Sequence, residues 1–228
     1  SGVYVGRPAK NEKDKIGVSA KGGTNGENHN HNDIGSYAVV LGNETISGDQ
    51  GCAITYTRDW FENIAYKKYK SKGSYGHPVP FINNTAQKVG KEARGVELTS
   101  KFTNNTDTYK IDMLSAYNLP ELSLLTRTFI YDRKNNTFVV TDILKSNEEV
   151  SFECAITTRA NWKKISPNTL LLNKGGEKVY VQISCSVPFK IKDEVIEENA
   201  PAYTRIGIVC TDKVRSLKLT VQYSTKAP

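Results

Sequence analysis

Two of the three histidines in the chain stand one residue apart, in His29-Asn30-His31-Asn32-Asp33. In an extended segment successive side chains point to opposite sides, so His29, His31 and Asp33 are expected to project to the same side. Imidazole and carboxylate groups transfer protons and bind metal ions. The alternative interpretation is a polar loop in which the histidines only hydrogen-bond to nearby carbonyl groups.

Glycines surround this cluster and two further candidate ligands. Asp49 stands in Ser47-Gly48-Asp49-Gln50-Gly51, and His77 stands in Tyr75-Gly76-His77-Pro78. Both sequences are typical of turns, and functional residues concentrate on loops that a rigid scaffold positions. Imidazole and carboxylate groups on glycine-rich loops are candidate metal ligands.

The elements that must position these loops are predicted to be strands. Alternation of apolar and polar residues, or short apolar runs between turn signals, marks the following ranges: Gly2–Arg7, Ile16–Ala20, Tyr37–Leu41, Leu125–Tyr131, Phe138–Leu144, Phe152–Thr158, Val179–Ser184, Ile206–Cys210 and Arg215–Tyr223. The polar turn Asp132–Asn136 predicts a hairpin between two of them. We expect an all-β fold, an antiparallel β-sandwich with many hairpin-connected strands and little helix, and a single domain over residues 1–228.

The stretch Arg58–Lys72 is the main exception, because it is rich in Trp, Phe, Tyr and Lys. Two interpretations remain open, a short helix or a long loop. Within and beside it, Tyr56, Arg58, Tyr66 and Tyr69 are candidates for substrate contact, since a guanidinium can grip a carboxylate and a tyrosine can move protons. The alternatives are a surface ion pair for the arginine and ordinary core or interface packing for the tyrosines.

The composition favours a polyanionic partner over other classes. Lys and Arg total 31 against 24 Asp and Glu, a formal charge of +7. Nucleic acid is disfavoured, because the basic residues are spread along the chain and no nucleic-acid motif is present; an acidic polysaccharide suits the charge. No apolar run is long enough to span a membrane, and residues 1–20 show no signal-peptide pattern. The chain starts without Met, which indicates a part of something longer.

The four cysteines, Cys52, Cys154, Cys185 and Cys210, show no Cys-x-x-Cys spacing. Three lie in apolar strand-like runs, which favours buried free thiols. A disulfide between two of the strands stays open for an exported protein.

Four blocks of the chain resemble, in order, the signature motifs of one enzyme family. They are Gly26–Tyr37, Gly48–Gly51, Tyr56–Asp59 and Gly76–Asn83, and together they resemble the heparinase II/III-like polysaccharide lyases. Family members join an N-terminal α-helical toroid to a C-terminal β-sandwich, and this chain resembles the sandwich alone.

The resemblance implies β-elimination on polysaccharides that contain uronic acid, such as glycosaminoglycans or alginate. It implies that His31, Asp49 and His77 hold a zinc ion, which we interpret as structural, and that His29 reaches the cleft as a catalytic residue. It further implies a periplasmic or secreted location. Gln50 replaces a residue that is often proline in the family. The toroid, which supplies a catalytic tyrosine and carboxylate-neutralising groups, is missing, so we expect the isolated chain to be inactive.

Two rival interpretations compete with this resemblance. A metal-binding cupin barrel normally has a glutamate a few residues after the second histidine, but Ile34-Gly35-Ser36-Tyr37 stands there. A non-catalytic, zinc-containing carbohydrate-binding or structural sandwich remains open.

Overall fold

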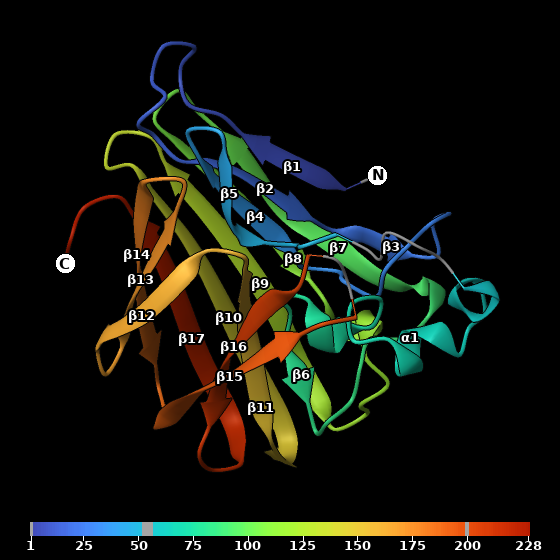
Figure 1. The fold of residues 1–228 in the computed structure, drawn as a ribbon. Coiled ribbons are helices and arrows are strands. Elements are labelled where there is room, and N and C mark those ends of the chain that lie inside the picture. The colour runs from blue at the N-terminus through green and yellow to red at the C-terminus, as the bar shows by residue number, and fades with distance from the viewer. Residues whose placement is uncertain (1, 52–56, 199–200) are drawn as a thin grey trace.

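The computed structural model describes residues 2–51, 57–198 and 201–228. Its strand pairings are all antiparallel and form three sheets (Figure 1). The first sheet has four strands in the order β1 (Val3–Gly6), β2 (Gly17–Lys21), β4 (Tyr37–Leu41) and β5 (Glu44–Gly48). The three strands predicted in this part of the chain are confirmed.

The second sheet is the largest, with nine strands. Their order is β12 (Asn161–Ser166), β13 (Thr169–Lys174), β14 (Glu177–Cys185), β17 (Val214–Ser224), β10 (Thr137–Val150), β9 (Leu122–Asp132), β8 (Thr106–Asp112), β7 (Gly90–Phe102) and β3 (Gly23–Asn25). The predicted hairpin is confirmed, because β9 and β10 pair directly on either side of the turn, with Asp132 opposite Thr137.

The third sheet has four strands in the order β15 (Phe189–Ile196), β16 (Tyr203–Cys210), β11 (Phe152–Thr158) and β6 (Phe81–Ile82). Helix is scarce in the described residues, as expected. It consists of α1 (Ala65–Lys68) and three 3₁₀ turns, η1 (Arg58–Phe61), η2 (Ser74–Gly76) and η3 (Leu114–Ala116). The stretch Arg58–Lys72 therefore contains two short helical turns separated by irregular chain. No helix in the described ranges is long and apolar enough to cross a membrane.

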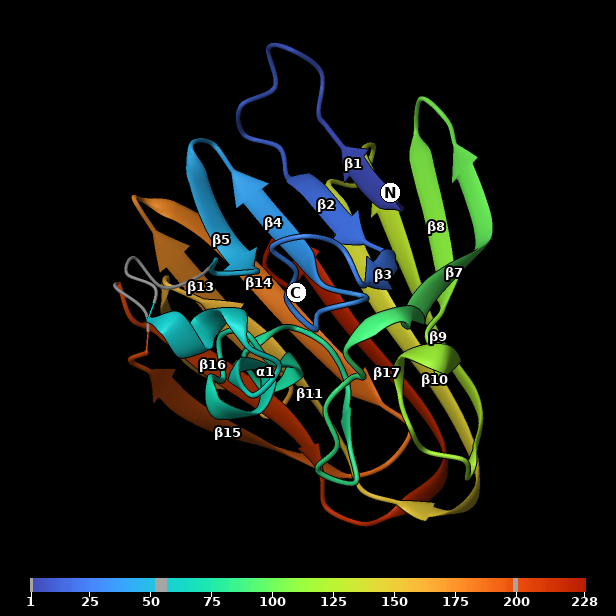
Figure 2. The same cartoon turned by 90° about the vertical axis from the view of Figure 1, so that its right-hand side faces the viewer.

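The two smaller sheets cover the same face of the nine-stranded sheet (Figures 1 and 2). Two residues of β9 that point into the sandwich contact different sheets. The Phe129 ring packs 6.3 Å from the Tyr37 ring of the first sheet. Arg127 contacts Cys154 of the third sheet. Tyr37 also shares a hydrogen bond of 2.8 Å with Tyr223. This layered arrangement is the predicted antiparallel β-sandwich.

Hydrogen bonds join the two smaller sheets side by side. The Thr157 hydroxyl of β11 donates to the Gly48 carbonyl at 2.5 Å, and the Ser47 hydroxyl of β5 donates to the Thr157 carbonyl at 3.2 Å. These bonds fix the end of β5, which leads directly into Asp49.

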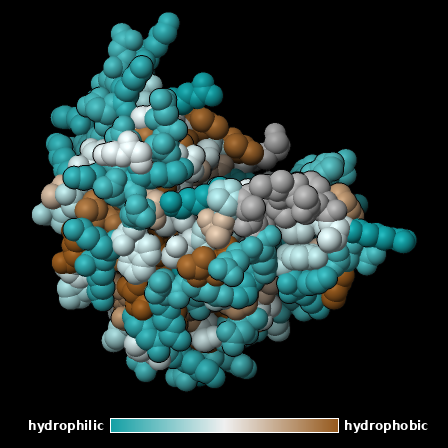
Figure 3. Space-filling view, viewed as in Figure 1, coloured by the Kyte–Doolittle hydropathy of each residue, from teal (hydrophilic) through white to brown (hydrophobic). Residues whose placement is uncertain are grey.

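Hydrophobic side chains lie scattered among polar ones on the outside of the sandwich. Figure 3 shows this mixture, with hydrophilic residues covering most of the visible face. Single exposed apolar residues of this kind are normal on a folded protein. The three cysteines in the described ranges are free; Cys154 is buried, whereas Cys185 and Cys210 are partly exposed. Cys52 lies outside the described residues.

Candidate metal centre and its cleft

His31, Asp49 and His77 come together from three separate segments. One ligand atom from each residue lies within 4.8 Å of the others. His31 stands between β3 and β4, Asp49 follows the last residue of β5, and His77 follows η2. Pairing of β4 with β5 sets Ala38 opposite Gly48, and the Asp49 amide then donates to the Tyr37 carbonyl at 3.1 Å. The local sheet thus holds the carboxylate beside the two rings.

His77 presents an unpaired nitrogen to this cluster. Its Nε2 lies 3.0 Å from the Ser71 carbonyl oxygen, which can only accept, so Nε2 carries a proton, and in the neutral ring Nδ1 is then the electron-pair donor. Nδ1 is buried and has no hydrogen-bond partner among the described residues. It lies 3.6 Å from Asp49 Oδ2, too far for a hydrogen bond. The neutral ring would thus place two electron-pair donors, His77 Nδ1 and Asp49 Oδ2, close enough to bind the same cation.

The protonation states of His31 and Asp49 also suit a cation. Burial, followed by the nearby His77, lowers the pKa of His31 to about 4, so its ring is neutral near pH 7. Burial alone would raise the pKa of Asp49, but His77 and the Gly51 amide, which donates to Oδ1 at 2.8 Å, lower it below its usual value. Two imidazoles and one carboxylate are the donor set of many zinc sites, so the residue types fit that ion.

The expectation that His29, His31 and Asp33 share one side is wrong. The segment is built of turns and bends, and His29 has a positive φ of 57°, which turns the chain. Asp33 is buried and forms an ion pair with Lys21. Of the three residues, His31 alone joins the cluster, and His29 is exposed.

His29 lies at a cleft beside the cluster. The cleft has a volume of about 270 Å³, and His29, His31, Trp60, Tyr66 and Lys72 contribute to its lining. The Trp60 ring lies 6.3 Å from the His31 ring. The cleft therefore joins an exposed imidazole and three aromatic side chains, Trp60, Phe61 and Tyr66, to the metal-binding group.

Lys72 organises the wall of the cleft. Its ammonium group donates to the Trp60 carbonyl and lies 4.5 Å from the centre of the Tyr66 ring and 5.4 Å from that of Trp60. Burial lowers the pKa of Lys72. Tyr66 donates to the Asn30 carbonyl at 3.3 Å, and burial raises its pKa, so it is a hydrogen-bond donor at neutral pH.

Arg58 and Tyr69, two other candidate substrate residues, are absent from the lining of this cleft. Arg58 is exposed in η1 and is absent from the cleft lining. The Tyr69 hydroxyl donates to Asp59 at 3.0 Å. Tyr56 lies outside the described residues.

Arg127 is a residue of the site that sequence reasoning missed. Its guanidinium is fully buried and forms two hydrogen bonds of 2.7 Å to the Asp142 carboxylate. Its Nη1 also donates to the carbonyls of Gly35, at 2.7 Å, and Pro78, at 2.6 Å. Arg127 thus ties the segment after His31 and the residue after His77 to the large sheet. The sequence feature that could have revealed Arg127 is a charged residue at an inward-facing position of an otherwise apolar strand.

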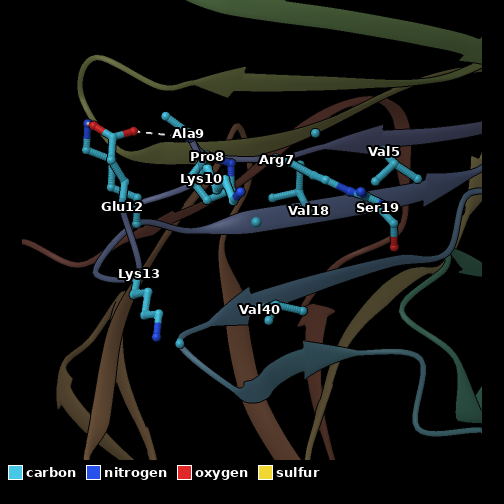
Figure 4. A pocket seen from close by; sticks show the side chains of 14 residues that line it. Val5, Arg7, Pro8, Ala9, Lys10, Glu12, Lys13, Val18, Ser19 and Val40 are labelled. Atoms are coloured by element: carbon cyan, nitrogen blue, oxygen red, sulfur yellow. Dashed lines mark hydrogen bonds and ion pairs between the residues drawn. The ribbon is translucent and has the colours of Figure 1, made fainter.

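A separate groove of about 450 Å³ lies at the opposite end of β4, where Val40 and Gly42 contribute to it. Figure 4 shows it along β2 and the loop that precedes that strand, with apolar side chains such as Val18 and basic ones such as Arg7 and Lys10. Glu12 accepts a hydrogen bond of 3.2 Å from the Ala9 amide there. The groove shares no lining residue with the cleft at His29.

Comparison with known proteins identifies the fold. No protein-family model and no curated protein sequence matches the chain. Among solved structures, the heparan sulfate lyase HepC from Pedobacter heparinus matches with a TM-score of 0.77 at 16% identity, over 100% of this chain and 36% of that chain. A heparinase III matches with a TM-score of 0.74 at 15% identity, over 99% of this chain and 36% of that chain.

A second heparinase III gives a TM-score of 0.75 at 16% identity, over 98% of this chain and 35% of that chain. The chain therefore spans about a third of the length of these enzymes. The resemblance seen in the four sequence blocks is confirmed at the level of fold: the chain has the fold of the corresponding third of heparinase III and heparan sulfate lyase.

Proposed function

We propose that this chain is the β-sandwich part of a polysaccharide lyase that cleaves acidic, uronic-acid-containing polysaccharides by β-elimination. The observation that carries the proposal is the meeting of His31, Asp49 and His77 beside a cleft that exposes His29. The shared fold with heparan sulfate lyase and the formal charge of +7 support the substrate class.

In this proposal His31, Asp49 and His77 hold one zinc ion with a structural role. Bound zinc would supply the positive charge that keeps these three segments together. The buried Nδ1 of His77, which lacks a hydrogen-bond partner among the described residues and faces Asp49, supports the choice of that atom as a ligand. The Ser71 carbonyl fixes the ring, as carbonyl partners do for metal-bound histidines.

The reaction requires three acts: neutralisation of the uronate carboxylate, removal of the C5 proton, and protonation of the O4 leaving group. We assign proton exchange with the sugar to His29, because its exposed imidazole lines the cleft and can donate or accept a proton. The partly exposed Tyr66 would present a flat apolar surface to the sugar ring, and the buried Trp60 would support the wall behind it. The remaining groups are expected from a helical toroid, and the one-third coverage of the matched enzymes supports such a second domain.

The proposal includes an exported protein, periplasmic or secreted, since polymeric uronans lie outside the cytoplasm. The rival function is a non-catalytic, zinc-containing sandwich that binds carbohydrate.

The experiment that separates the two functions uses the full parent protein, with the ultraviolet absorbance of the unsaturated uronide product as the readout on a panel of acidic polysaccharides. His29→Ala should keep its zinc and its melting temperature while losing on the order of 10²-fold in turnover, the effect typical of a general acid or base. Asn28→Ala, at the next position of the same cleft lining, is the matched control and should turn over like the parent.

His31→Ala should lose metal and stability together. Residues 1–228 alone should be inactive, because catalytic groups of the other domain are no longer held near the substrate. Full activity in His29→Ala would remove the catalytic assignment, and binding without turnover by the parent protein would favour the rival function.

A further inference from the structure

Cys185 and Cys210 belong to different sheets, but the strands that end with them finish side by side. Cys185 is the last residue of β14 in the large sheet, and Cys210 is the last residue of β16 in the third sheet (Figure 1). Three residues cross between the sheets, and then Phe189 of β15 pairs directly with Cys210. The Thr211 amide donates to the Pro188 carbonyl at 3.1 Å, which holds this crossing against the end of β16.

The two thiols are in contact. The Cys210 thiol hydrogen-bonds to the Cys185 sulfur, which also accepts from the backbone amides of Val187 and Ser186. These bonds lower the pKa of Cys185 to about 7, while the same contact and burial raise that of Cys210. Both side chains pack against the hydrophobic core yet remain partly exposed, so a reagent can reach them.

We propose that Cys185 and Cys210 are a redox-active pair that forms a disulfide bridge between the large sheet and the third sheet. The oxidant is a disulfide compound, either a small molecule or a protein thiol–disulfide oxidoreductase. The Cys185 thiolate attacks one sulfur of the oxidant, forms a mixed disulfide and expels a thiolate. The Cys210 thiol then loses its proton to solvent and attacks the Cys185 sulfur, which expels the second thiolate. Two protein thiols are oxidised, and one disulfide is reduced to two thiols.

Cys154 provides an internal contrast. It is fully enclosed, accepts a hydrogen bond from Arg127 at 3.1 Å, and has a pKa raised to about 11, mainly by burial. A buried thiol of high pKa is inert, whereas a partly exposed thiolate reacts. Among the three cysteines in the described ranges, oxidation is therefore directed to the Cys185–Cys210 pair.

The test begins with the chain in glutathione buffers that range from fully reduced to fully oxidised. Free thiols are then blocked with N-ethylmaleimide, and the protein is digested with trypsin without reduction. A linked pair of peptides, residues 179–190 with residues 206–213, is expected to increase with oxidised glutathione and to vanish after reduction. Cys154→Ser should form the same linked pair.

Stability provides the second readout. The denaturant midpoint of the parent chain should rise on oxidation, because the bridge restricts the unfolded chain. This redox response should be absent in Cys185→Ser and in Cys210→Ser but retained in Cys154→Ser. Blocked thiols on both peptides at every glutathione ratio would overturn the proposal, as would a linkage of Cys185 to a different cysteine.

Discussion

Removal of the buried Arg127 side chain should be among the most damaging single changes in this sandwich. Arg127→Met keeps much of the side-chain volume but removes the guanidinium. The Asp142 carboxylate, 3% exposed, then loses its paired charge, and the carbonyls of Gly35 and Pro78 lose a donor. The substitution therefore acts on the core and on the segments that carry the candidate metal ligands.

The magnitude follows from these contacts. Breaking a buried ion pair by removing one partner costs about 3–5 kcal/mol, because the other charge stays buried. Each orphaned buried carbonyl adds about 1 kcal/mol or more. The sum approaches the whole free energy of unfolding of an ordinary domain, about 5–15 kcal/mol. Arg127→Met should therefore be unfolded or only marginally folded at room temperature.

A second variant separates charge from packing. Arg127→Met combined with Asp142→Leu removes both charges, so it should be clearly more stable than Arg127→Met alone. It still lacks the two bonds to Gly35 and Pro78, and we expect its zinc affinity to be lower by about 10- to 100-fold, as when groups that orient metal ligands are removed.

Urea unfolding followed by circular dichroism measures the stabilities, and chelator competition measures zinc affinity. Equal urea midpoints for the parent and Arg127→Met would refute this account of the core. A double variant with parental zinc affinity would refute the positioning role.

Two further predictions concern the residues of the metal centre. In metal-free protein the folded-state pKa of His31, about 4, lies below the usual 6.5, so the unfolded chain binds the proton more readily. Stability should therefore fall as the pH drops from about 6.5 to 4, by at most about 3 kcal/mol, whereas His31→Gln should show a flatter profile in pH-dependent thermal melts. Gly48→Ala should unfold at a lower urea concentration than Gly176→Ala and should lose zinc. Both glycines have a positive φ, but an added Cβ at Gly48 would clash with the Tyr37 carbonyl oxygen. An added Cβ at Gly176 would meet nothing within 4 Å. Similar midpoints for the two variants would show that this close approach does not fix Asp49.

The local features of the fold could be predicted from sequence. The hairpin of β9 and β10 could be recognised because two apolar runs flank the polar turn Asp132–Asn136. The strand pattern and the turn chemistry both depend only on residues that are close together in the sequence. The division into three sheets could not be predicted in the same way. β10 pairs on its other side with β17, so that Val140 lies opposite Val221. No local pattern selects so distant a partner, because the choice depends on which apolar faces meet in the core.

The candidate site divides similarly. The residue types and the family resemblance indicated His31, Asp49 and His77, and these three meet in the structure. The expected sharing of one side by His29 and Asp33 failed because it assumed an extended segment, while the positive φ of His29 turns the chain. A glycine-rich stretch can adopt such turns, and its sequence does not specify which.

Metal analysis of purified protein tests the central claim most directly. The parent chain, prepared without chelator, should contain one zinc ion per molecule, and so should His29→Ala. His77→Ala should contain close to none, because it loses the ligand atom whose lone pair faces Asp49. Parental zinc content in His77→Ala, or close to no zinc in the parent chain, would contradict the proposed metal centre.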